Sequence, residues 1–326
     1  QNAGADAYNT AVGYNAGLSV TTGTLNTLVG GLAGDALTTG NRNVAIGYEA
    51  LSTEDTGSRN VAIGEGSLTL LNYDGAAYNV AIGYDSGHAM TTGIQNTLIG
   101  GLAGDALTTG SNNIAIGVLA LSAEDTGGKS IAVGMQALAA QNYDGDAYNV
   151  AVGHQAGLAV TTGIQNTVVG GRALQANTVG LGNVALGYQA MYTNVDGSKC
   201  VAIGTNALLA QEPASALDMY NVAIGYNAGY AITTGIDNTL IGALAGDAIT
   251  SSSQNVALGS SALSALTIGT ANVALGYRTL FASVDGDHNT AVGYKALEDY
   301  EDGDGNGHNT AIGSKSQLNA STGEFN

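Results

Sequence analysis

The stretch NVAIGYEALSTEDTGSR, residues 43–59, recurs along almost the whole chain of 326 residues. Its first residue, Asn43, has counterparts at an almost fixed spacing. The asparagines lie at positions 9, 26, 43, 60, 79, 96, 113, 149, 166, 183, 221, 238, 255, 272, 289 and 309, and Ser130 and Cys200 fill the two gaps. A period of about 17 residues is too short for helical hairpin repeats and fits one coil of a β-solenoid.

Each copy of the repeat begins with a short apolar stretch. The first residue after the asparagine is always Val, Ile or Thr, and the third is always Val, Ile or Leu. Because β-branched residues favour strands and strand side chains alternate, we predict a strand in each copy. We expect Val44, Ile46 and their equivalents inside the coil, and Ala45 and its equivalents, mostly Ala or Leu, on an opposite apolar face.

A glycine follows every predicted strand, as at Gly47, and a small residue and then Leu or Gly come a few positions later. This pattern predicts a glycine bend and a second short strand in each coil. One coil has too little apolar surface to offset the entropy of ordering its backbone, so neighbouring coils must stack. The sequence therefore predicts an all-β fold, a parallel β-solenoid (β-roll) of about 18 coils, as a single array over residues 1–326.

Both ends of the sequence fall inside the repeat. Residues 1–9, QNAGADAYN, match residues 141–149, QNYDGDAYN, and Asn326 lies one further period after Asn309. Solenoids need caps to protect their end edges. We therefore expect that this sequence is the middle of a longer polypeptide, with caps and anchor outside it, or that its ends stack on other copies.

The coils form blocks of four. The intervals from Asn9 to Asn79 and from Asn79 to Asn149 are equal in length, and the next block, to Asn221, is slightly longer. The fourth coil of each block is lengthened, and the lengthened turns are residues 71–78, 141–148 and 211–220, with a later one at 298–308. Insertions of this kind lie at the periphery of a solenoid.

The composition excludes several classes of partner. Eight basic and 26 acidic residues give a net charge of −18, which opposes binding to nucleic acid or to anionic membrane surfaces. We expect no membrane insertion in this segment, because no apolar stretch is long enough to cross a bilayer. Cys200 is the only cysteine, so it forms no intrachain disulfide, and we expect a shielded small residue in the asparagine position.

Catalytic patterns are weak, and we expect no enzyme. The four histidines are scattered, and no Ser/His/Asp order or metal-ligand spacing can be assembled from them. Adjacent carboxylates occur as Glu54 with Asp55 and as Glu124 with Asp125. Glycan hydrolysis uses paired carboxylates, but these pairs recur in step with the repeat, so we expect solvated turns.

The acidic turn EDGDGNG contains Asp302, Asp304 and Asn306, alternating oxygen ligands separated by glycines. Such oxygens suit calcium, although position 313, where an EF-hand has its last glutamate, is glycine. A calcium site and a solvated Asp/Gly turn are the two alternatives, and we expect no other cofactor. Weaker versions of the pattern are Asp144 with Asp146, and Asp285 with Asp287.

Tyrosine recurs at the fifth position after the asparagine, in the residues Tyr14, Tyr48, Tyr84, Tyr188, Tyr226, Tyr277 and Tyr294. Sugar binding is one role for stacked tyrosines on a surface. Amphipathic aromatic side chains also shield exposed edges or fill the seam between subunits. The sequence leaves both roles open for this set.

The segments NVAIG, NIAIG, SIAVG and NTAVG resemble the head repeats of trimeric autotransporter adhesins, the YadA-like β-roll. Even closer is the resemblance to the NTAIGYxAL…TTG repeats of phage tail-fibre and tail-fibre-domain proteins. It covers residues 9–326, although the unit in this chain is longer than the adhesin-head repeat.

The resemblance implies a homotrimer in which three β-rolls pack side by side through an apolar face. It also implies an extracellular structural and adhesive protein, a rigid fibre segment of a virion tail fibre or of a cell-surface adhesin. Its partners would be a host receptor or a surface glycan. A self-stacking extracellular filament subunit and a glycan-degrading tailspike are the alternatives.

Overall fold

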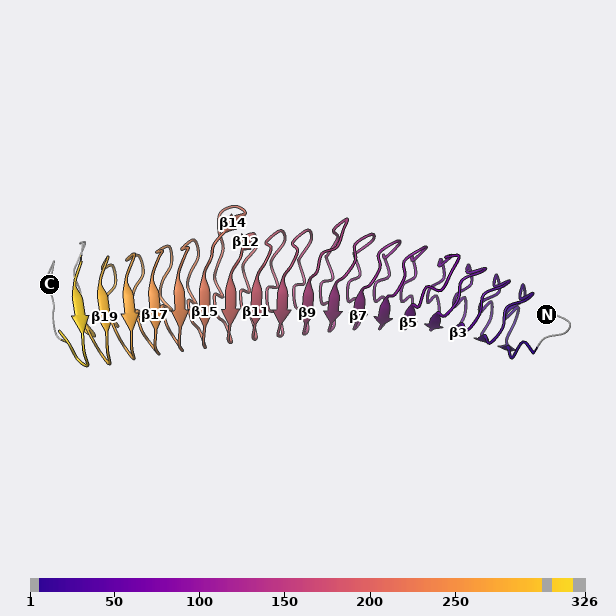
Figure 1. Ribbon diagram of the computed structural model, residues 1–326, viewed down its shortest axis with the longest axis horizontal. Helices are drawn as coiled ribbons and strands as arrows, with labels where there is room; N and C mark the ends of the chain where they lie inside the picture. The colour runs from indigo at the N-terminus through magenta and orange to yellow at the C-terminus, as the bar shows by residue number, and fades with distance from the viewer. Residues whose placement is uncertain (1–5, 301–306, 319–326) are drawn as a thin grey trace. The chain divides into compact units, whose positions relative to one another are not determined.

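The computed structural model describes residues 6–300 and 307–318. The chain forms two compact units, Gln1–Thr162 and Gly163–Asn326, called unit 1 and unit 2 below. Each unit is a stack of parallel coils with one short strand per coil (Figure 1). The described residues contain no helix and make about 17 turns in all. The predicted all-β parallel β-solenoid is confirmed, whereas a single array over residues 1–326 stays a prediction.

The strands of unit 1 are three residues long. They are β1 (Thr10–Val12), β2 (Thr27–Val29), β3 (Val44–Ile46), β4 (Val61–Ile63), β5 (Val80–Ile82), β6 (Thr97–Ile99), β7 (Ile114–Ile116), β8 (Ile131–Val133) and β9 (Val150–Val152).

Unit 2 has the same strand in every coil and one additional pair of two-residue strands, β12 and β14. Its strands are β10 (Thr167–Val169), β11 (Val184–Leu186), β12 (Gly197–Ser198), β13 (Val201–Ile203), β14 (Leu217–Asp218), β15 (Val222–Ile224), β16 (Thr239–Ile241), β17 (Val256–Leu258), β18 (Val273–Leu275), β19 (Thr290–Val292) and β20 (Thr310–Ile312).

Neighbouring coils pair in parallel and without a register shift. In β3 and β4, for example, Val44 lies opposite Val61 and Ile46 lies opposite Ile63. The lengthened coils keep this register, because the additional residues between β4 and β5 are accommodated in the turn and Val61 still lies opposite Val80. Equivalent residues of successive coils therefore stack in continuous files along each unit.

The prediction that Val44 and Ile46 point into the coil is wrong. Ala45, between them, is fully buried, whereas Val44 is half-buried and Ile46 is 36% exposed. The middle residue is buried in all the other three-residue strands except β1. Strand side chains alternate with a period of two, so an assignment that is one residue out reverses both faces. The outward apolar face is therefore the Val/Ile/Leu row, not the Ala/Leu row.

The interior of a coil is narrow and is filled mainly from the turns. In the coil of β3, Ala45 shares the core with Leu51, and both are fully buried. In the coil of β2, the inward strand residue is Leu28 and glycine occupies the turn position, where a Cβ on Gly34 would lie 2.8 Å from the Leu28 side chain. Of the middle strand position and this turn position, only one carries leucine in each of these two coils, because a close-packed interior leaves no room for both.

The predicted second strand is absent from these coils. The residues after Gly47 form turns, in which Glu49 has a φ of 55° and Leu51 a φ of 54°. Left-handed residues cannot continue an extended strand. The amide of Leu51 still donates a hydrogen bond of 3.0 Å to the carbonyl of Ser67 in the next coil, so the backbone remains paired between coils without a strand.

The repeated asparagine forms a buried ladder. The backbone N–H of Asn43 donates to Oδ1 of Asn26 at 2.9 Å, and Nδ2 of Asn43 donates to the carbonyl of Gly57 at 2.9 Å. Asn60 in turn donates its backbone N–H to Oδ1 of Asn43 at 2.9 Å. One side chain therefore binds both a turn carbonyl and the amide of the next ladder asparagine, with no exposure to solvent.

Two coils lack the ladder asparagine and compensate with a glutamine. Ser130 and Cys200 are fully buried in its place, and Gln141 and Gln211, in the lengthened turns that follow, are fully buried as well. Gln141 donates Nε2–H to Oγ of Ser130 at 2.8 Å. Gln211 approaches the Cys200 sulfur with Nε2 at 3.3 Å. The glutamine amide thus restores the polar partner that the shorter side chain lacks.

The expected glycine bend after each strand is confirmed, and two constraints require glycine there. Gly117 has a φ of +134°, which L side chains rarely adopt, and a Cβ there would lie 2.5 Å from the carbonyl carbon of Gly134 in the next coil. Gly101 is different, because nothing lies within 4 Å of an added Cβ. Glycine is therefore required at position 117, whereas position 101 has room for a side chain.

We predict that Ala115→Asp unfolds the chain or destabilises it by more than about 4 kcal/mol, because it places an unpaired charge in the core. Ile116→Asp, on the outward row, should cost less than about 1 kcal/mol in the dissociated chain. Chemical denaturation in dilute solution, followed by circular dichroism, measures both. Equal losses for the two variants would contradict the orientation of the strand.

We predict that Gly117→Ala destabilises the chain by about 2–4 kcal/mol, through its positive φ and the clash with the next coil. The matched variant Gly101→Ala should change stability by less than about 0.5 kcal/mol. Thermal unfolding measured side by side checks this. A stable Gly117→Ala variant would show that the coil spacing is not fixed by this contact.

Candidate functional site

The outward rows of the strands form an uncharged stripe on each unit. The described three-residue strands contain only Ala, Val, Ile, Leu and Thr, in a chain whose net charge is −18. Large apolar side chains remain exposed along the stripe, at Val12, Ile46 and Val152 in unit 1 and at Leu186, Leu258 and Ile312 in unit 2. We call this surface the strand face. A contiguous exposed apolar patch is typical of a contact surface.

The recurring tyrosines border the strand face, directly after the bend glycine. Tyr14, Tyr48, Tyr84, Tyr188, Tyr226, Tyr277 and Tyr294 are all between 45% and 76% exposed. Within the described residues only Tyr277 and Tyr294 stack on each other, with ring centroids 5.7 Å apart and an interplanar angle of 13°. Stacking needs tyrosine in two consecutive coils, and most of the set alternates with other residues.

Two of these tyrosines have an acidic neighbour in sequence. Hydrogen bonding to Glu49 and then its negative charge raise the pKa of Tyr48, and Asp85 raises the pKa of Tyr84 in the same way. Both phenols are exposed, and both stay protonated at neutral pH. Each tyrosine presents a hydroxyl donor on an apolar ring. This combination is compatible with a seam between subunits and with a polar ligand.

The candidate calcium ligands Asp302, Asp304 and Asn306 lie outside the described residues. Among residues 6–300 and 307–318, no three His, Cys, Asp or Glu side chains are grouped closely enough to hold a metal ion. In the weaker acidic turns, Asp144, Asp146 and Asp287 have other partners. Asp144 accepts a hydrogen bond from Thr126 at 3.0 Å, and Asp287 accepts one from Thr270 at 3.0 Å.

One recurring cluster was not predicted from the sequence. In each of three lengthened coils, a tyrosine precedes the ladder asparagine, and a basic residue of the preceding coil lies over its ring: Arg59 over Tyr78, Lys129 over Tyr148 and Lys199 over Tyr220. The repeat register could have predicted this contact, because the basic residue and the tyrosine each directly precede a ladder position and therefore lie next to each other in neighbouring coils. Cation–π contact of this kind fixes the basic side chain.

In two of these clusters an aspartate neutralises the lysine. Lys129 forms an ion pair of 2.7 Å with Asp146, and Lys199 one of 2.6 Å with Asp218. These hydrogen bonds to aspartate are the main reason that the pKa of each lysine is raised. All four groups are exposed, so each pair contributes little to stability.

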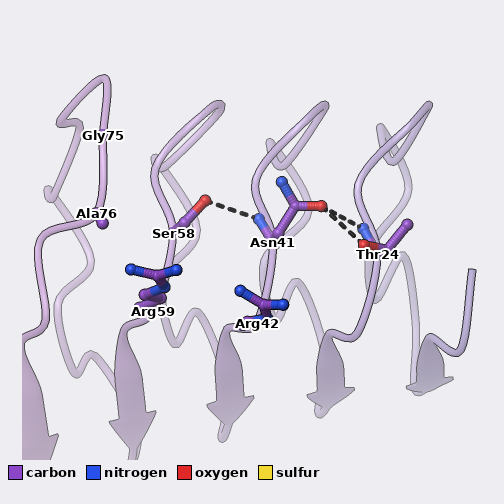
Figure 2. A pocket seen from close by; sticks show the side chains of 7 residues that line it. All are labelled: Thr24, Asn41, Arg42, Ser58, Arg59, Gly75 and Ala76. Carbon is purple, nitrogen blue, oxygen red and sulfur yellow. Dashed lines mark hydrogen bonds between the residues drawn. The ribbon is translucent and has the colours of Figure 1, made fainter.

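The first cluster has no aspartate and opens into a groove. The groove has a volume of about 380 Å³ and is lined by Thr24, Asn41, Arg42, Ser58, Arg59, Gly75 and Ala76 (Figure 2). Hydrogen bonds hold its polar wall, since Asn41 accepts from the backbone and hydroxyl of Thr24 at 2.8 and 2.9 Å, and Ser58 accepts from the Asn41 amide at 3.0 Å. Arg59 donates to the hydroxyl of Tyr78.

The expectation that Glu54 and Glu124 lie in solvated turns is wrong. Both are fully buried, at an interior position that carries leucine in neighbouring coils, as at Leu37. Glu54 accepts a hydrogen bond of 2.7 Å from the amide of Gly57, and Glu124 accepts one of 2.9 Å from the side chain of Gln141. Burial raises the pKa of both carboxyls, and these hydrogen bonds partly oppose the shift. Both carboxyls therefore stabilise turns by hydrogen bonds inside the coil, and neither lines the groove of unit 1 or the equivalent hollow of unit 2.

Cys200 is fully buried, as expected from its place in the asparagine ladder. Burial raises its pKa to about 11, so the thiol is protonated at neutral pH and is a poor nucleophile. The histidines are less scattered than the sequence indicated, because His288 and His308 lie in successive coils and stack with centroids 4.8 Å apart.

The chain matches no model of a known protein family, and no curated protein is detectably similar to it. Among the residues that the structure describes, no helix has the length and hydropathy needed to cross a membrane.

We predict that Glu54 and Glu124 make the chain less stable as pH rises. Their pKa values are higher in the folded chain than the ordinary 4.5, so the folded state binds more protons. The contribution is fully present below the unfolded pKa and is lost as pH rises through the folded pKa. Thermal unfolding at several pH values should therefore show that the melting temperature of Glu54→Leu, Glu124→Leu, relative to the parent, increases with pH.

Asp74→Asn is the control for this experiment. Asp74 is an exposed carboxylate that accepts a hydrogen bond from Thr56, so its replacement removes a charge without changing the core. A difference between the double variant and the parent that does not vary with pH would contradict the assignment of buried, proton-binding carboxyls.

Proposed function

We propose that this chain is a structural and adhesive fibre segment that assembles with copies of itself through the strand face. The observation that carries the proposal is the stripe of exposed Val, Ile and Leu side chains, without a charged residue, along each unit. Exposed apolar area of this kind is stabilised by burial against a partner. Assembly would cover Ile46, Leu258 and their equivalents.

A second copy of the chain is the partner that suits the strand face best. Its equivalent residues recur with every coil, so two strand faces laid side by side match in spacing along their length. The acidic residues lie outside the three-residue strands, so the copies would meet at a surface free of their mutual repulsion. Identical surfaces also allow closed, symmetric assembly.

The trimeric state, the attachment role and the location follow the resemblance to tail-fibre and adhesin-head repeats. We propose a homotrimer on a virion tail fibre or a cell surface, outside the cell, that contacts a host receptor or a surface glycan. The tyrosines beside the strand face fit the seam of such an assembly, because amphipathic aromatic residues are enriched in interfaces. The exposed stack of Tyr277 and Tyr294 is also suited to a sugar ring.

The two alternative functions make different demands on the molecule. A glycan-degrading tailspike needs two carboxyl groups facing one cleft, whereas Glu54 and Glu124 are buried inside their coils. A self-stacking filament would join ends of the solenoid rather than strand faces, and edge pairing of strands is the physical basis of such growth. Side-by-side assembly would instead bury the strand face, to which each described three-residue strand contributes.

We predict that the purified chain is a trimer by light scattering and that Ile116→Asp, Leu258→Asp converts it to a monomer that keeps its β-type circular dichroism. The reason is that two charges would have to be buried without partners in the interface. Ala214→Asp, an added charge at an exposed turn position, should leave the trimer intact.

Three outcomes would reject the proposal in different ways. A monomeric parent at high concentration would remove the assembly. Filaments that grow end to end and persist in the double variant would favour the self-stacking subunit. Release of sugars from capsule or lipopolysaccharide by the parent chain would favour the tailspike.

A further inference from the structure

The groove of unit 1 is lined by two arginines, Arg42 and Arg59, that have no carboxylate partner within the described residues, although the chain is strongly acidic. Only eight residues of the chain are basic, against 26 acidic ones. Four of the eight, Lys129, Lys199, Arg278 and Lys295, form ion pairs. Within the described residues, neither Arg42 nor Arg59 lies within ion-pair distance of an acidic side chain.

Comparison of the three lengthened coils explains why Arg59 is unpaired. Ala76 pairs with Ser58 across the coils, as Asp146 pairs with Gly128 and as Asp218 pairs with Ser198. Ala76, Asp146 and Asp218 occupy the same position of the repeat, three residues before a ladder asparagine. In the second and third blocks the aspartate neutralises the lysine beside it. In the first block alanine leaves that place without a carboxylate, and Ala76 lines the groove.

The side chains of Arg42 and Arg59 extend from neighbouring coils (Figure 2). Arg42 donates its backbone N–H to Thr24 at 3.0 Å, and Arg59 donates its own to Asn41 at 3.0 Å, so they occupy equivalent positions in neighbouring coils. Coils of a parallel ladder are about 4.8 Å apart, and both side chains lie on the same side of the groove (Figure 2). Tyr78 fixes Arg59 through its ring, 5.1 Å from the guanidinium carbon, and through its hydroxyl.

We propose that this groove binds the oxyanion group, carboxylate or phosphate, of an acidic ligand of sugar size. Arginine presents paired N–H donors that match such groups, and an anion relieves the repulsion between the two cations. The volume of about 380 Å³ is in the range of small-ligand sites. Thr24, Asn41 and Ser58 add hydroxyl and amide groups for a polyhydroxyl body. The inference adds a ligand class to the attachment role proposed above and stands on the groove itself.

The equivalent hollow of unit 2 has a different chemistry and serves as an internal comparison. It has a volume of about 440 Å³ and is lined by Val179, Leu181, Ser198, Ala216, Leu217 and Asp218. Leu181 stands where Asn41 stands in unit 1, and Asp218 stands where Ala76 does. An apolar wall and a carboxylate make this hollow unsuited to an anion, so binding should be confined to the groove of unit 1.

The test uses the full chain and three ligands with one sugar ring: glucuronate, glucose 6-phosphate and glucose. Binding is followed by ligand-observed NMR and calorimetry at constant ionic strength. Ala76→Asp introduces the aspartate that the other blocks carry, and it should weaken binding of the acidic sugars at least about tenfold. Arg42→Gln, Arg59→Gln should have the same effect. Ala214→Asp adds the same charge at an exposed turn of unit 2 and should leave affinity unchanged.

Binding of glucuronate, of glucose 6-phosphate or of both, without glucose, and its loss in Ala76→Asp would support the inference and identify the preferred oxyanion. Equal binding by the parent and Ala76→Asp, equal binding of glucose, or no binding of either acid at about 10 mM would overturn it. Light scattering on the same samples separates the two proposals. A monomer that binds the acids rejects only the assembly, and a trimer that does not bind them rejects only the groove.

Discussion

The buried asparagine ladder is the interaction on which the coils of both units depend. Each rung combines a turn carbonyl, such as that of Gly57, with the backbone amide of the next coil. A buried amide without partners costs about 1–3 kcal/mol, so each asparagine is compatible with burial only while its neighbour is folded. Where Ser130 or Cys200 interrupts the ladder, Gln141 or Gln211 restores the polar contact inside the coil.

Stacking without a register shift has a second consequence, because every residue meets its own equivalent in the next coil. Apolar files gain from this repetition, and the strand face is the result. Files of one charge would be unfavourable, and Lys129 and Lys199 meet a tyrosine at the equivalent position of the next coil, Tyr148 and Tyr220. Lys129 also forms an ion pair with Asp146 of the following coil, two positions away from its own equivalent. Arg42 and Arg59 depart from this rule, because they are equivalent residues of like charge in neighbouring coils, and the groove that they line is therefore chemically distinct from its counterpart in unit 2.

The candidate sites were only partly accessible from sequence. The register located the recurring tyrosines, but their exposure and the single stack of Tyr277 on Tyr294 within the described residues depend on which coils are neighbours in space. The acidic pairs at Glu54 and Glu124 recur as turns do, yet both glutamates are inside. Their sequence context gives no sign of burial, because the position is recognised as interior only when the leucines of adjacent coils are aligned with it.

The sequence by itself determined the period, the place of each three-residue strand and the bend glycine, because all three recur in every coil and the short, nearly constant spacing leaves little freedom. It did not determine which side of the strand is inside. Alternation has a period of two, and both sides of VAI are apolar, so no polar row marks the solvent. The tertiary structure decided which side is inside, through the volume available within the coil. Leu51 and its equivalents fill the coil from the turns, so only the small Ala45 fits inside, and Val44 and Ile46 are turned outward.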